Sequence, residues 1–381
     1  MPDVGIEFAF QDARGIPLDL ALTCTPGELV ALVGPSGSGK STVLRAIAGL
    51  HRPQSGRVRC NGACWLDTAA GIDVPPHRRR VGLVFQNYAL FPHMNALENV
   101  AAALAHRPAP ERAMRARALL ELVHLGELGS RLPAQLSGGQ QQRVAVARAL
   151  AREPDVLLLD DPFSAVDKET RRRLYRELTE LRARFEMPTL LVTHDFDEAA
   201  RLADRICLVS GGRGLQTGTP AEVLAHPVSV EAARLVDLQN LFEATVVAAT
   251  DDRLVLDWHG RRLEAPAHAG FAVGHRVAWA VPSTQVILLR DGHPAGQTLP
   301  ARAARLGGAI DEIVALSEST GIVVRLEGPD APRLSLTVPA RFALTAGLAI
   351  GRKVEVMLLA EGVHVMPAEI DSPAAATEPA G

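Results

Sequence analysis

The chain has 381 residues, more than one typical core holds, so we expect two domains. Apolar residues make up 47% and charged residues 22%, as in an ordinary globular protein. The net charge of −3 gives no support to nucleic-acid binding, and the longest apolar runs are far too short to span a membrane. The start of the chain lacks the pattern of a signal peptide. Cys60 and Cys64 have no second ligand pair, so free thiols in a reducing cytoplasm are expected rather than a zinc site.

Short apolar segments alternate with helical patterns through the first 235 residues. Near the N-terminus, segments 6–10 and 18–22 alternate apolar and polar residues with a loop between them, which predicts an antiparallel β flap. Alternating strands and helices then predict a mostly parallel sheet covered on both faces. A helix is expected over 168–185, and the expected strands are 30–33, 81–85, 156–159, 190–193 and 206–210.

A glycine-rich segment follows the first long apolar strand and precedes a helical pattern. It reads GPSGSGKST at positions 34–42, and in this strand–loop–helix setting it is typical of a phosphate-binding loop. Glycines let backbone N–H groups turn toward phosphate oxygens, and the helix N-terminus adds positive potential. We expect Lys40 to bridge the β- and γ-phosphates of ATP, Ser41 to ligate Mg²⁺ and Thr42 to contact the α-phosphate. The predicted ATP-binding residues of this loop are Gly34, Pro35, Ser36, Gly37, Ser38, Gly39, Lys40, Ser41 and Thr42.

Two adjacent carboxylates, Asp160 and Asp161, end the apolar run 156–159. Burying an ionised carboxylate at such a position is costly unless a cation pairs with it. In a P-loop fold, the acid that ends a later parallel strand faces the metal beside the loop. Asp160 is therefore expected on the magnesium side, as a direct ligand or through a water molecule.

A second glycine-containing helix start lies in the segment LSGGQQQRVAVARAL, positions 136–150. Ser137 has the character of an N-cap, so this segment is a second anion-binding helix N-terminus. One nucleotide does not need two phosphate-binding segments, 34–42 and 136–140, from the same protomer. We therefore expect a head-to-tail homodimer, in which Ser137, Gly138, Gly139 and Gln140 close over the γ-phosphate held by the partner.

Together these motifs resemble those of the nucleotide-binding subunit of ABC transporters. The resemblance covers the first 235 residues and includes five motifs in the order of that family: 34–42, Gln86, 136–140, 156–161 and His194. It implies a P-loop ABC-type α/β domain with a helical subdomain at about 87–155. It also implies an ATPase that uses ATP and Mg²⁺.

The resemblance implies roles for further residues. Gln86 would sense Mg²⁺ and the attacking water and couple the site to a membrane partner, and His194 would reach the γ-phosphate. Asp167 lies in a loop that would contact the opposite protomer, and it can also cap the helix 168–185. Phe10 is the candidate for stacking on adenine, although it can equally belong to the core with Phe8.

Asp161 departs from the pattern of the family, which usually has glutamate there. The side chain is shorter by one methylene, which withdraws the carboxylate by about 1 Å, and displacements of that size can cost about a hundredfold in rate. We hypothesise that Asp161 is still the general base but that hydrolysis is slower than in a glutamate-bearing relative. The alternative is that a backbone adjustment restores the reach.

After residue 236 the helical pattern fades and short alternating segments take over. Segments 274–288 and 351–365 resemble each other, which predicts two copies of a small β unit at about 240–290 and 300–367. This all-β region resembles the OB-like regulatory modules (TOBE or MOP type) of importer ATPases for oxyanions, sugars and polyamines. The tail, 368–381, is small and polar and is expected to be disordered.

The resemblance is to a bacterial import ATPase on the cytoplasmic face of the inner membrane. Its partners would be a second copy, an integral membrane permease and, indirectly, a periplasmic solute-binding protein, with no nucleic acid. Segments 88–93 and 111–124 would offer the cleft in which the permease docks.

The solute is suggested by segment 70–94, which resembles the molybdate-uptake ATPase most, although sulfate, iron and polyamine ATPases share most of it. Within it, we interpret Arg78, Arg79 and Arg80 as a solvated charge run rather than as a phosphate or partner contact. In the segment LPARAARLGG, 299–308, Pro300 and Ala303 replace the serine and asparagine of molybdate-binding modules. Those replacements put oxyanion binding by this module in doubt.

Two other classes remain as alternatives. A soluble ABC ATPase for nucleic acid or ribosomes is disfavoured, because Lys40 and Ser137 are too close for an inserted coiled coil and the chain has one nucleotide domain and no basic, aromatic-rich stripe. The second alternative is a regulatory protein whose ATPase is inactive. The only feature that favours it is Asp161, which stands where the family usually has glutamate.

Overall fold

The computed structural model describes residues 5–164, 166–289, 302–328 and 330–368. The chain forms two compact units that divide between Val223 and Leu224, inside helix α7 (Pro220–Ala225). The sequence suggested a boundary after residue 235, because the helical pattern continues through α8 (Val230–Leu235). That helix belongs to the second unit. The boundary between the units therefore lies before the point in the sequence where the helical pattern gives way to strands.

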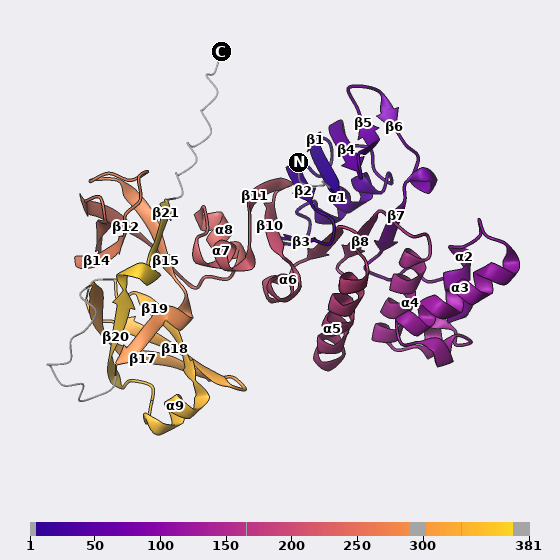
Figure 1. Cartoon of the computed structure of the whole chain (residues 1–381). Coiled ribbons are helices and arrows are strands. Elements are labelled where there is room, and N and C mark those ends of the chain that lie inside the picture. Colours follow the sequence, from indigo (N-terminus) through magenta and orange to yellow (C-terminus); the bar gives the residue numbers. More distant parts are fainter. Residues whose placement is uncertain (1–4, 165, 290–301, 329, 369–381) are drawn as a thin grey trace, which may run out of the picture. The chain divides into compact units, whose positions relative to one another are not determined.

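The first unit is built on one sheet of eleven strands, in the order β6-β5-β4-β1-β2-β11-β10-β3-β9-β8-β7 (Figure 1). Strands β10, β3, β9, β8 and β7 are parallel neighbours, whereas β6, β5, β4, β1 and β2 pair antiparallel. The expected parallel core with an antiparallel flap is therefore confirmed. The strands are β1 (Ile6–Asp12), β2 (Leu18–Cys24), β3 (Leu29–Val33), β4 (Ser55–Cys60), β5 (Ala63–Asp67), β6 (Ile72–Asp73), β7 (Val81–Val84), β8 (Val156–Asp160), β9 (Thr189–Thr193), β10 (Arg205–Ser210) and β11 (Arg213–Gly218).

Between β7 and β8 the described chain is helical, as expected for the helical subdomain (Figure 1). Pairs of its helices pack on one another, with α4 also lying against β7. The helices of the first unit are α1 (Lys40–Ile47), η1 (Pro76–Arg78), α2 (Ala96–Ala102), α3 (Ala109–Leu122), η2 (Gly126–Leu128), η3 (Pro133–Gln135), α4 (Gly138–Leu150), α5 (Lys168–Arg184) and α6 (Phe196–Leu202).

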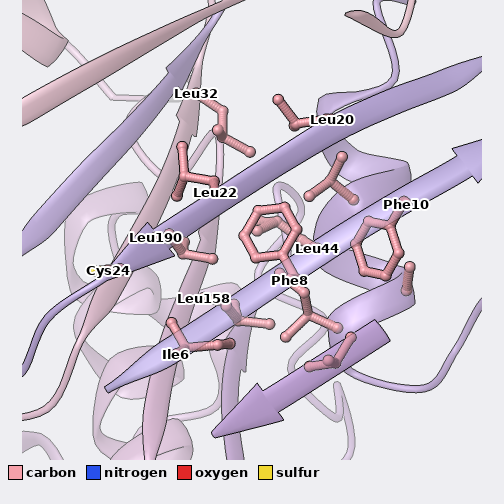
Figure 2. Packing of buried hydrophobic residues seen from close by; sticks show 14 of the residues in the cluster. Ile6, Phe8, Phe10, Leu20, Leu22, Cys24, Leu32, Leu44, Leu158 and Leu190 are labelled. Carbon is pink, nitrogen blue, oxygen red and sulfur yellow. The ribbon is translucent and has the colours of Figure 1, made fainter. Parts of the chain in front are cut away.

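The core of the first unit explains the two apolar patterns in its sequence. Every residue of β3, β8 and β9 is buried, as expected for parallel strands covered on both faces. Strand β2 alternates strictly between buried and exposed residues. The rings of Phe8 and Phe10 lie in this core beside Leu44 of α1 (Figure 2). The flap is thus fixed to the parallel sheet by ordinary apolar packing.

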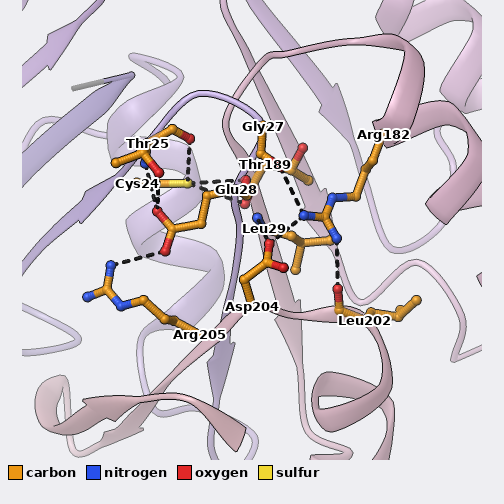
Figure 3. Close-up of polar contacts among 10 residues, drawn as sticks. All are labelled: Cys24, Thr25, Gly27, Glu28, Leu29, Arg182, Thr189, Leu202, Asp204 and Arg205. Carbon is orange, nitrogen blue, oxygen red and sulfur yellow. Dashed lines mark hydrogen bonds and ion pairs between the residues drawn. The ribbon is translucent and has the colours of Figure 1, made fainter. Parts of the chain in front are cut away.

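Polar contacts fix the edge at which β3 begins (Figure 3). The Glu28 carboxylate accepts hydrogen bonds from the Thr25 backbone N–H at 2.7 Å and from Arg205 at 3.1 Å. The Asp204 carboxylate accepts from the Leu29 N–H at 2.8 Å and also binds Arg182 of α5. Because the start of β3 is held in this way, the loop at its other end leaves the sheet from a defined place.

The second unit contains two five-stranded antiparallel sheets, β14-β13-β12-β15-β21 and β16-β20-β17-β18-β19. These two all-β sheets are consistent with the predicted OB-like domain. The strands are β12 (Asn240–Ala249), β13 (Arg253–Trp258), β14 (Arg261–Pro266), β15 (Arg276–Val281), β16 (Val286–Leu289), β17 (Ala303–Ala315), β18 (Ser319–Leu326), β19 (Arg333–Pro339), β20 (Lys353–Leu359) and β21 (His364–Pro367). The remaining helical segments are α9 (Ala340–Thr345), η4 (Ser283–Gln285) and η5 (Ala360–Gly362).

The two halves of this unit share an order of elements but exchange their last strands. Strand β16 pairs with β20, and β21 pairs with β15. Each half therefore contributes its final strand to the sheet of the other half, and neither sheet is complete within one of the predicted repeats. The buried rings of Trp258 and Trp279 meet edge to face at 4.9 Å in the shared core.

Among the residues that the structure describes, no helix combines the length and apolar character that crossing a membrane requires.

Candidate active site

The glycine-rich loop lies between β3 and α1, where the sequence predicted it. Gly37 and Gly39 have φ values of 82° and 94°, in the left-handed region that glycine adopts without strain. A Cβ atom at Gly34 would lie 1.9 Å from the carbonyl oxygen of Val209, so that position excludes every side chain. Pro35, Ser36 and Gly37 form the exposed tip of the loop, which leaves its backbone accessible to a ligand.

Lys40 turns back into the loop from the first turn of α1. Its Nζ atom donates to the carbonyl oxygens of Gly34 at 2.8 Å and Pro35 at 2.7 Å, and to the Ser38 hydroxyl at 3.1 Å. Burial lowers the pKa of Lys40, while the carboxylates of Asp161 and Asp160 act in the opposite direction. The loop therefore holds a buried ammonium group at its centre, which suits it to a polyanion.

Ser41 connects the start of α1 to the end of β8. Its hydroxyl donates to the Asp160 carboxylate at 2.7 Å, and Asp160 is itself buried. A hydroxyl and a carboxylate oxygen at this distance form the hard, oxygen-only ligand set that Mg²⁺ prefers. Among the described residues there is no group of three His, Cys, Asp or Glu side chains arranged for a metal.

Asp161 lies at the centre of a second group of side chains. Its Oδ2 atom is 3.3 Å from Gln86 Nε2, at the end of β7, and 3.2 Å from His194 Nδ1, at the end of β9. Burial raises the pKa of Asp161, and the adjacent His194 lowers it. Because β7, β8 and β9 are parallel neighbours, their carboxyl ends bring these residues to one edge of the sheet beside the glycine-rich loop.

The backbone at Asp161 is unusual, because its φ of 45° lies in the left-handed region. Aspartate tolerates that region better than most side chains. Its N–H donates to the Val192 carbonyl at 2.9 Å, which fixes the turn against β9. The carboxylate is therefore held by the backbone as well as by Gln86 and His194.

Comparison with known proteins agrees with this arrangement. A family model described as ABC transporter matches residues 18–164. The spermidine/putrescine import ATP-binding protein PotA of Oleidesulfovibrio alaskensis is 38% identical over 330 residues, covering 85% of this chain and 84% of that protein. The Fe(3+) ions import ATP-binding protein FbpC of Agrobacterium fabrum is 40% identical over 329 residues, covering 85% and 90%. This chain belongs to the ABC transporter ATP-binding proteins.

Further relatives extend the likeness along the chain. The sulfate/thiosulfate import ATP-binding protein CysA 1 of Chromobacterium violaceum is 40% identical over 364 residues, covering 91% of this chain and 92% of that protein. A solved structure, "Dimeric structure of a post-hydrolysis state of the ATP-binding cassette MJ0796 bound to ADP and Pi", matches 56% of this chain and 98% of its own at 32% identity, with a TM-score of 0.48. The three import ATP-binding proteins and the family model show that the chain is an ATP-binding protein and an ATPase coupled to transport.

The four residues 137–140, here called the signature segment, lie at the start of α4. The Ser137 hydroxyl accepts from the Gln140 N–H at 3.4 Å, and the Gln140 side chain accepts from the Ser137 N–H at 2.9 Å, so the two form a capping box. A Cβ atom at Gly139 would lie 2.5 Å from Thr170 of α5. Gly138 is the first residue of α4. Within this protomer, Gly139 is thus required by the close approach of α4 to α5.

Asp167 is the N-cap of α5. Its carboxylate accepts from the backbone N–H groups of Glu169 at 3.1 Å and Thr170 at 3.0 Å. The structural role that the sequence allowed for Asp167 is therefore present, and its contact with a second protomer stays a prediction.

The prediction that Phe10 stacks on adenine is wrong in this structure. Its side chain is only 1% exposed, and its ring stacks on Phe8 with the centroids 5.2 Å apart. The alternation of β1 points Phe10 into the core, as the sequence allowed. Ile16 is instead 45% exposed, in the turn between β1 and β2, and its Cγ2 atom would lie 3.4 Å from a Cβ at Gly39.

The interpretation of Arg78, Arg79 and Arg80 as a solvated charge run is wrong for Arg79. The guanidinium of Arg79 is buried and donates to the carbonyl oxygens of Ala46 at 2.9 Å and Ile47 at 2.7 Å. It thereby satisfies carbonyl groups at the C-terminal end of α1, where positive charge is favourable. The neighbouring Arg78 and Arg80 are exposed or partly exposed, as expected.

Arg148 is a residue near the site that the sequence analysis missed. It donates to the carbonyl oxygens of Tyr88 at 2.8 Å and Ala89 at 2.7 Å, and its guanidinium lies over the Phe91 ring at 5.6 Å. Tyr88 and Ala89 both have positive φ, 59° and 45°, which strains non-glycine residues. Arg148, in the last turn of α4, therefore holds the strained segment that follows Gln86.

Glu198 is a second missed residue, buried in α6 shortly after His194. The Tyr175 hydroxyl donates to its carboxylate at 3.2 Å. Burial raises the pKa of Glu198 to about 7, while hydrogen bonds from Thr193 and Tyr175 lower it. The only sequence signal was an acidic residue on the buried side of a short helix.

Proposed function

We propose that this ATPase hydrolyses magnesium-ATP as a homodimer to drive the import of a small solute through a membrane permease. The observation that carries the proposal is the convergence of three parallel strand ends on the glycine-rich loop. There Lys40 and Ser41 lie beside Asp160, and Asp161 contacts both Gln86 and His194. This is the arrangement that phosphoryl transfer to water requires, with groups that neutralise charge next to groups that orient the nucleophile.

Ser41 and Asp160 would hold Mg²⁺, with Gln86 as an additional oxygen donor. When bound, the ion would neutralise charge on the β- and γ-phosphates. The support for these residues is the 2.7 Å contact between Ser41 and Asp160 and the burial of Asp160, whose charge a cation would compensate.

Asp161 acts as the general base in this proposal. Its carboxylate accepts the proton of the attacking water, and the 3.2 Å contact with His194 orients it. His194 has a largely exposed side chain, which can turn toward the γ-phosphate. Lys40 leaves its three loop acceptors for the β- and γ-phosphates, because charged phosphate oxygens are stronger acceptors than carbonyls.

Ile16 supplies the apolar surface for the nucleotide base. Its exposed side chain lies above the last glycine of the loop, and the buried Phe10 cannot be reached from solvent. An aliphatic contact gives the base a weaker platform than an aromatic ring would.

The complete site contains the signature segment of a second copy. Ser137, Gly138, Gly139 and Gln140 form a helix N-terminus suited to an anion. The nucleotide of their own copy already has the cradle at 34–42, which supports a head-to-tail homodimer with Asp167 near the partner.

The permease docks on the helical subdomain from the cytoplasmic side of the inner membrane. Segments 88–93 and 111–124 are the proposed contacts, and they carry the exposed apolar side chains of Phe91 and Met114. A periplasmic solute-binding protein delivers the solute to the permease and does not touch this chain. Arg148 then links the docking surface at Phe91 to α4.

The solute belongs to the group of polyamines, iron(III), sulfate or thiosulfate, and molybdate. The three relatives described above are named for spermidine or putrescine, Fe(3+), and sulfate or thiosulfate, whereas segment 70–94 resembles the molybdate-uptake ATPase. In the second unit, Arg302 is paired with Asp252, and Pro300 lies outside the described residues. The pairing of Arg302 gives no support to an oxyanion site in the second unit.

A reconstituted complex tests the proposal. The ATPase, purified with its permease in lipid vesicles, is assayed for ATP turnover with the solute-binding protein and each of spermidine, iron(III), sulfate, thiosulfate and molybdate. We expect one solute to stimulate turnover and Lys40→Ala to abolish it. If the chain hydrolyses ATP but associates with no permease and responds to no solute, a soluble ABC ATPase is the better reading. If wild type and Lys40→Ala are equally inactive, the chain is a regulatory protein.

A further inference from the structure

A cavity of about 350 Å³ in the second unit is lined by three histidines. His226 follows α7, His268 follows β14, and His364 begins β21. Glu361 and Gln285 line the same cavity. None of these residues belongs to the ATP site, so the cavity has chemistry that ATP hydrolysis does not explain.

Two of the imidazole rings face each other directly. The Nδ1 atoms of His226 and His364 are 3.4 Å apart, with the ring planes at 65°. The Nε2 atom of His364 lies 2.8 Å from the carbonyl oxygen of Pro227. A carbonyl only accepts, so Nε2 must carry the proton, and the lone pair of the neutral ring is on Nδ1, the atom that lies nearest to His226 Nδ1.

The surroundings of His364 disfavour the charged form of this ring. Burial lowers the pKa of His364, the hydrogen bond to Pro227 raises it, and the charges of His226 and His268 lower it further. Neutral imidazole is the form that binds metals. A histidine that donates its other N–H to a backbone carbonyl has the arrangement commonly found around metal-binding histidines.

The separation of the two nitrogen atoms is compatible with shared coordination of one metal ion. Hydrogen bonds from N–H groups usually span about 2.7–3.2 Å, so 3.4 Å is long for such a bond. Two nitrogen ligands about 2.0–2.1 Å from one tetrahedral ion lie about 3.3–3.4 Å apart. The observed spacing thus equals an edge of that tetrahedron.

We propose that His226 and His364 bind a divalent first-row transition cation, of the class of Zn²⁺, Co²⁺ or Ni²⁺, through their Nδ1 atoms. Imidazole ligands favour these ions over Mg²⁺ and Ca²⁺. The described residues hold no ready-made group of three side chains for a metal, so water or a movement of His268 or Glu361 completes the coordination. The ion joins the segment after α7 to β21, the strand that closes the first sheet of this unit. The proposal does not depend on the proposed function.

Metal binding to the full-length chain, freed of metal by a chelator and kept without nucleotide, tests the proposal. Zn²⁺ affinity is measured by competition with a chromophoric chelator, and Co²⁺ binding by its visible d–d absorption. We expect one Zn²⁺ per chain, weakened about tenfold or more by His226→Gln and by His364→Gln, with the Co²⁺ absorption lost in both. His226 is exposed, so His226→Gln should fold even if the half-buried His364 does not tolerate change.

His275→Gln is the matched control, because His275 is an exposed histidine of the same unit that does not line the cavity. It should bind Zn²⁺ and Co²⁺ as the wild type does. His268→Gln should weaken binding if that ring completes the coordination, and leave it unchanged if water does. The proposal is overturned if the doubly substituted chain, His226→Gln with His364→Gln, binds as many ions as tightly as the wild type.

Discussion

The two units of the ATPase differ in the kinds of polar side chain that they bury. In the part of the first unit that the structure describes, Asp12, Lys40, Arg79, Asp160 and Glu198 are buried ionisable side chains. In the described residues of the second unit, the buried polar side chains are Asn240 and Thr320, and neither is ionisable. Burying charge is costly unless it is paired, and buried ionisable groups are concentrated at functional sites more often than in purely packed cores.

Two of the buried charges of the first unit lie at the glycine-rich loop and at a strand end, whereas an aromatic cluster lies in the core of the second unit. Lys40 and Asp160 lie at the loop beside β3 and at the tip of β8. In the second unit, Trp258 and Trp279 pack with Phe242, whose ring centroid is 4.8 Å and 5.0 Å from theirs. Substitution of Lys40 or Asp160 should therefore change catalysis, and substitution of the aromatic residues should change stability.

The largest effect is expected for Lys40→Ala. The substitution removes the ammonium that the loop holds through three acceptors, and the loss of one such electrostatic group costs about 10²–10³ in rate. We expect ATP turnover to fall about a thousandfold, with the thermal unfolding of the second unit unchanged. Retention of a tenth of wild-type turnover would show that Lys40 does not neutralise the phosphates.

Trp258→Ala tests the contribution of the aromatic core to the stability of the second unit. Removing a fully buried indole typically costs about 3–5 kcal/mol of stability. Differential scanning calorimetry should show the transition of the second unit at a lower temperature, while the transition that magnesium-ATP protects stays in place. A shift of both transitions by the same amount would mean that the two units unfold as one.

Glu198→Gln probes a buried charge of the first unit through pH. The folded-state pKa of Glu198 is about 7, above its ordinary value of 4.5, so the folded state binds this proton more tightly than the unfolded state does. Its contribution to the free energy of unfolding is fully present below pH 4.5 and is lost as the pH rises through 7. We expect about 3 kcal/mol of pH-dependent stability to disappear in Glu198→Gln, measured by urea unfolding between those pH values. Identical pH profiles for both proteins would contradict the raised pKa.

Asp161→Glu asks whether the short carboxylate limits the rate. Glutamate extends the carboxylate by about 1 Å, and we expect turnover to rise by up to about a hundredfold. The positive φ at this position suits aspartate better than glutamate, so the melting temperature should fall slightly. Turnover equal to or below that of the wild type in a folded variant would defeat the idea, and Asp161→Asn serves as the inactive reference.

The smallest effect is expected for Arg148→Ala. The substitution leaves the carbonyl groups of Tyr88 and Ala89 without a cation and releases the strained turn next to Gln86. We expect kcat to fall about tenfold with KM for ATP little changed, because the nucleotide loop is intact. Arg176→Ala, an exposed arginine of α5 outside the proposed docking segments, is the control and should match the wild type. A change in KM with kcat unchanged would argue against positioning of Gln86.

The arrangement of the proposed nucleotide site could be predicted because each of its motifs is a short continuous segment. The loop 34–42 is one continuous segment, and Asp160 directly follows the run that becomes β8. Strand order places Gln86 and His194 beside Asp161, and that order follows from alternating strands and helices. Here local sequence, topology and function point to the same place.

Arg79, Arg148 and Phe10 were not predictable in the same way, because their roles depend on what approaches them from a distance. Arg79 binds carbonyls about thirty residues away, and Arg148 binds carbonyls about sixty residues away. For Phe10, strand alternation shows only that its side chain lies on the same face of the strand as that of Phe8. Packing against the rest of the unit decides that this face is the buried one. The exchanged strands β16 and β21 have the same cause, because pairing between repeats leaves no local signal.

The homodimer is the claim on which the proposed mechanism rests most heavily, and the mass of the Asp161→Asn chain in solution tests it most directly. Asp161→Asn should keep magnesium-ATP bound without hydrolysing it. Light scattering with saturating magnesium-ATP should then give twice the 40.6 kDa mass of the chain, and the mass should return to that of one chain when Ser137→Arg blocks the signature helix. A mass of one chain at every protein concentration, with ATP demonstrably bound, would contradict the composite site.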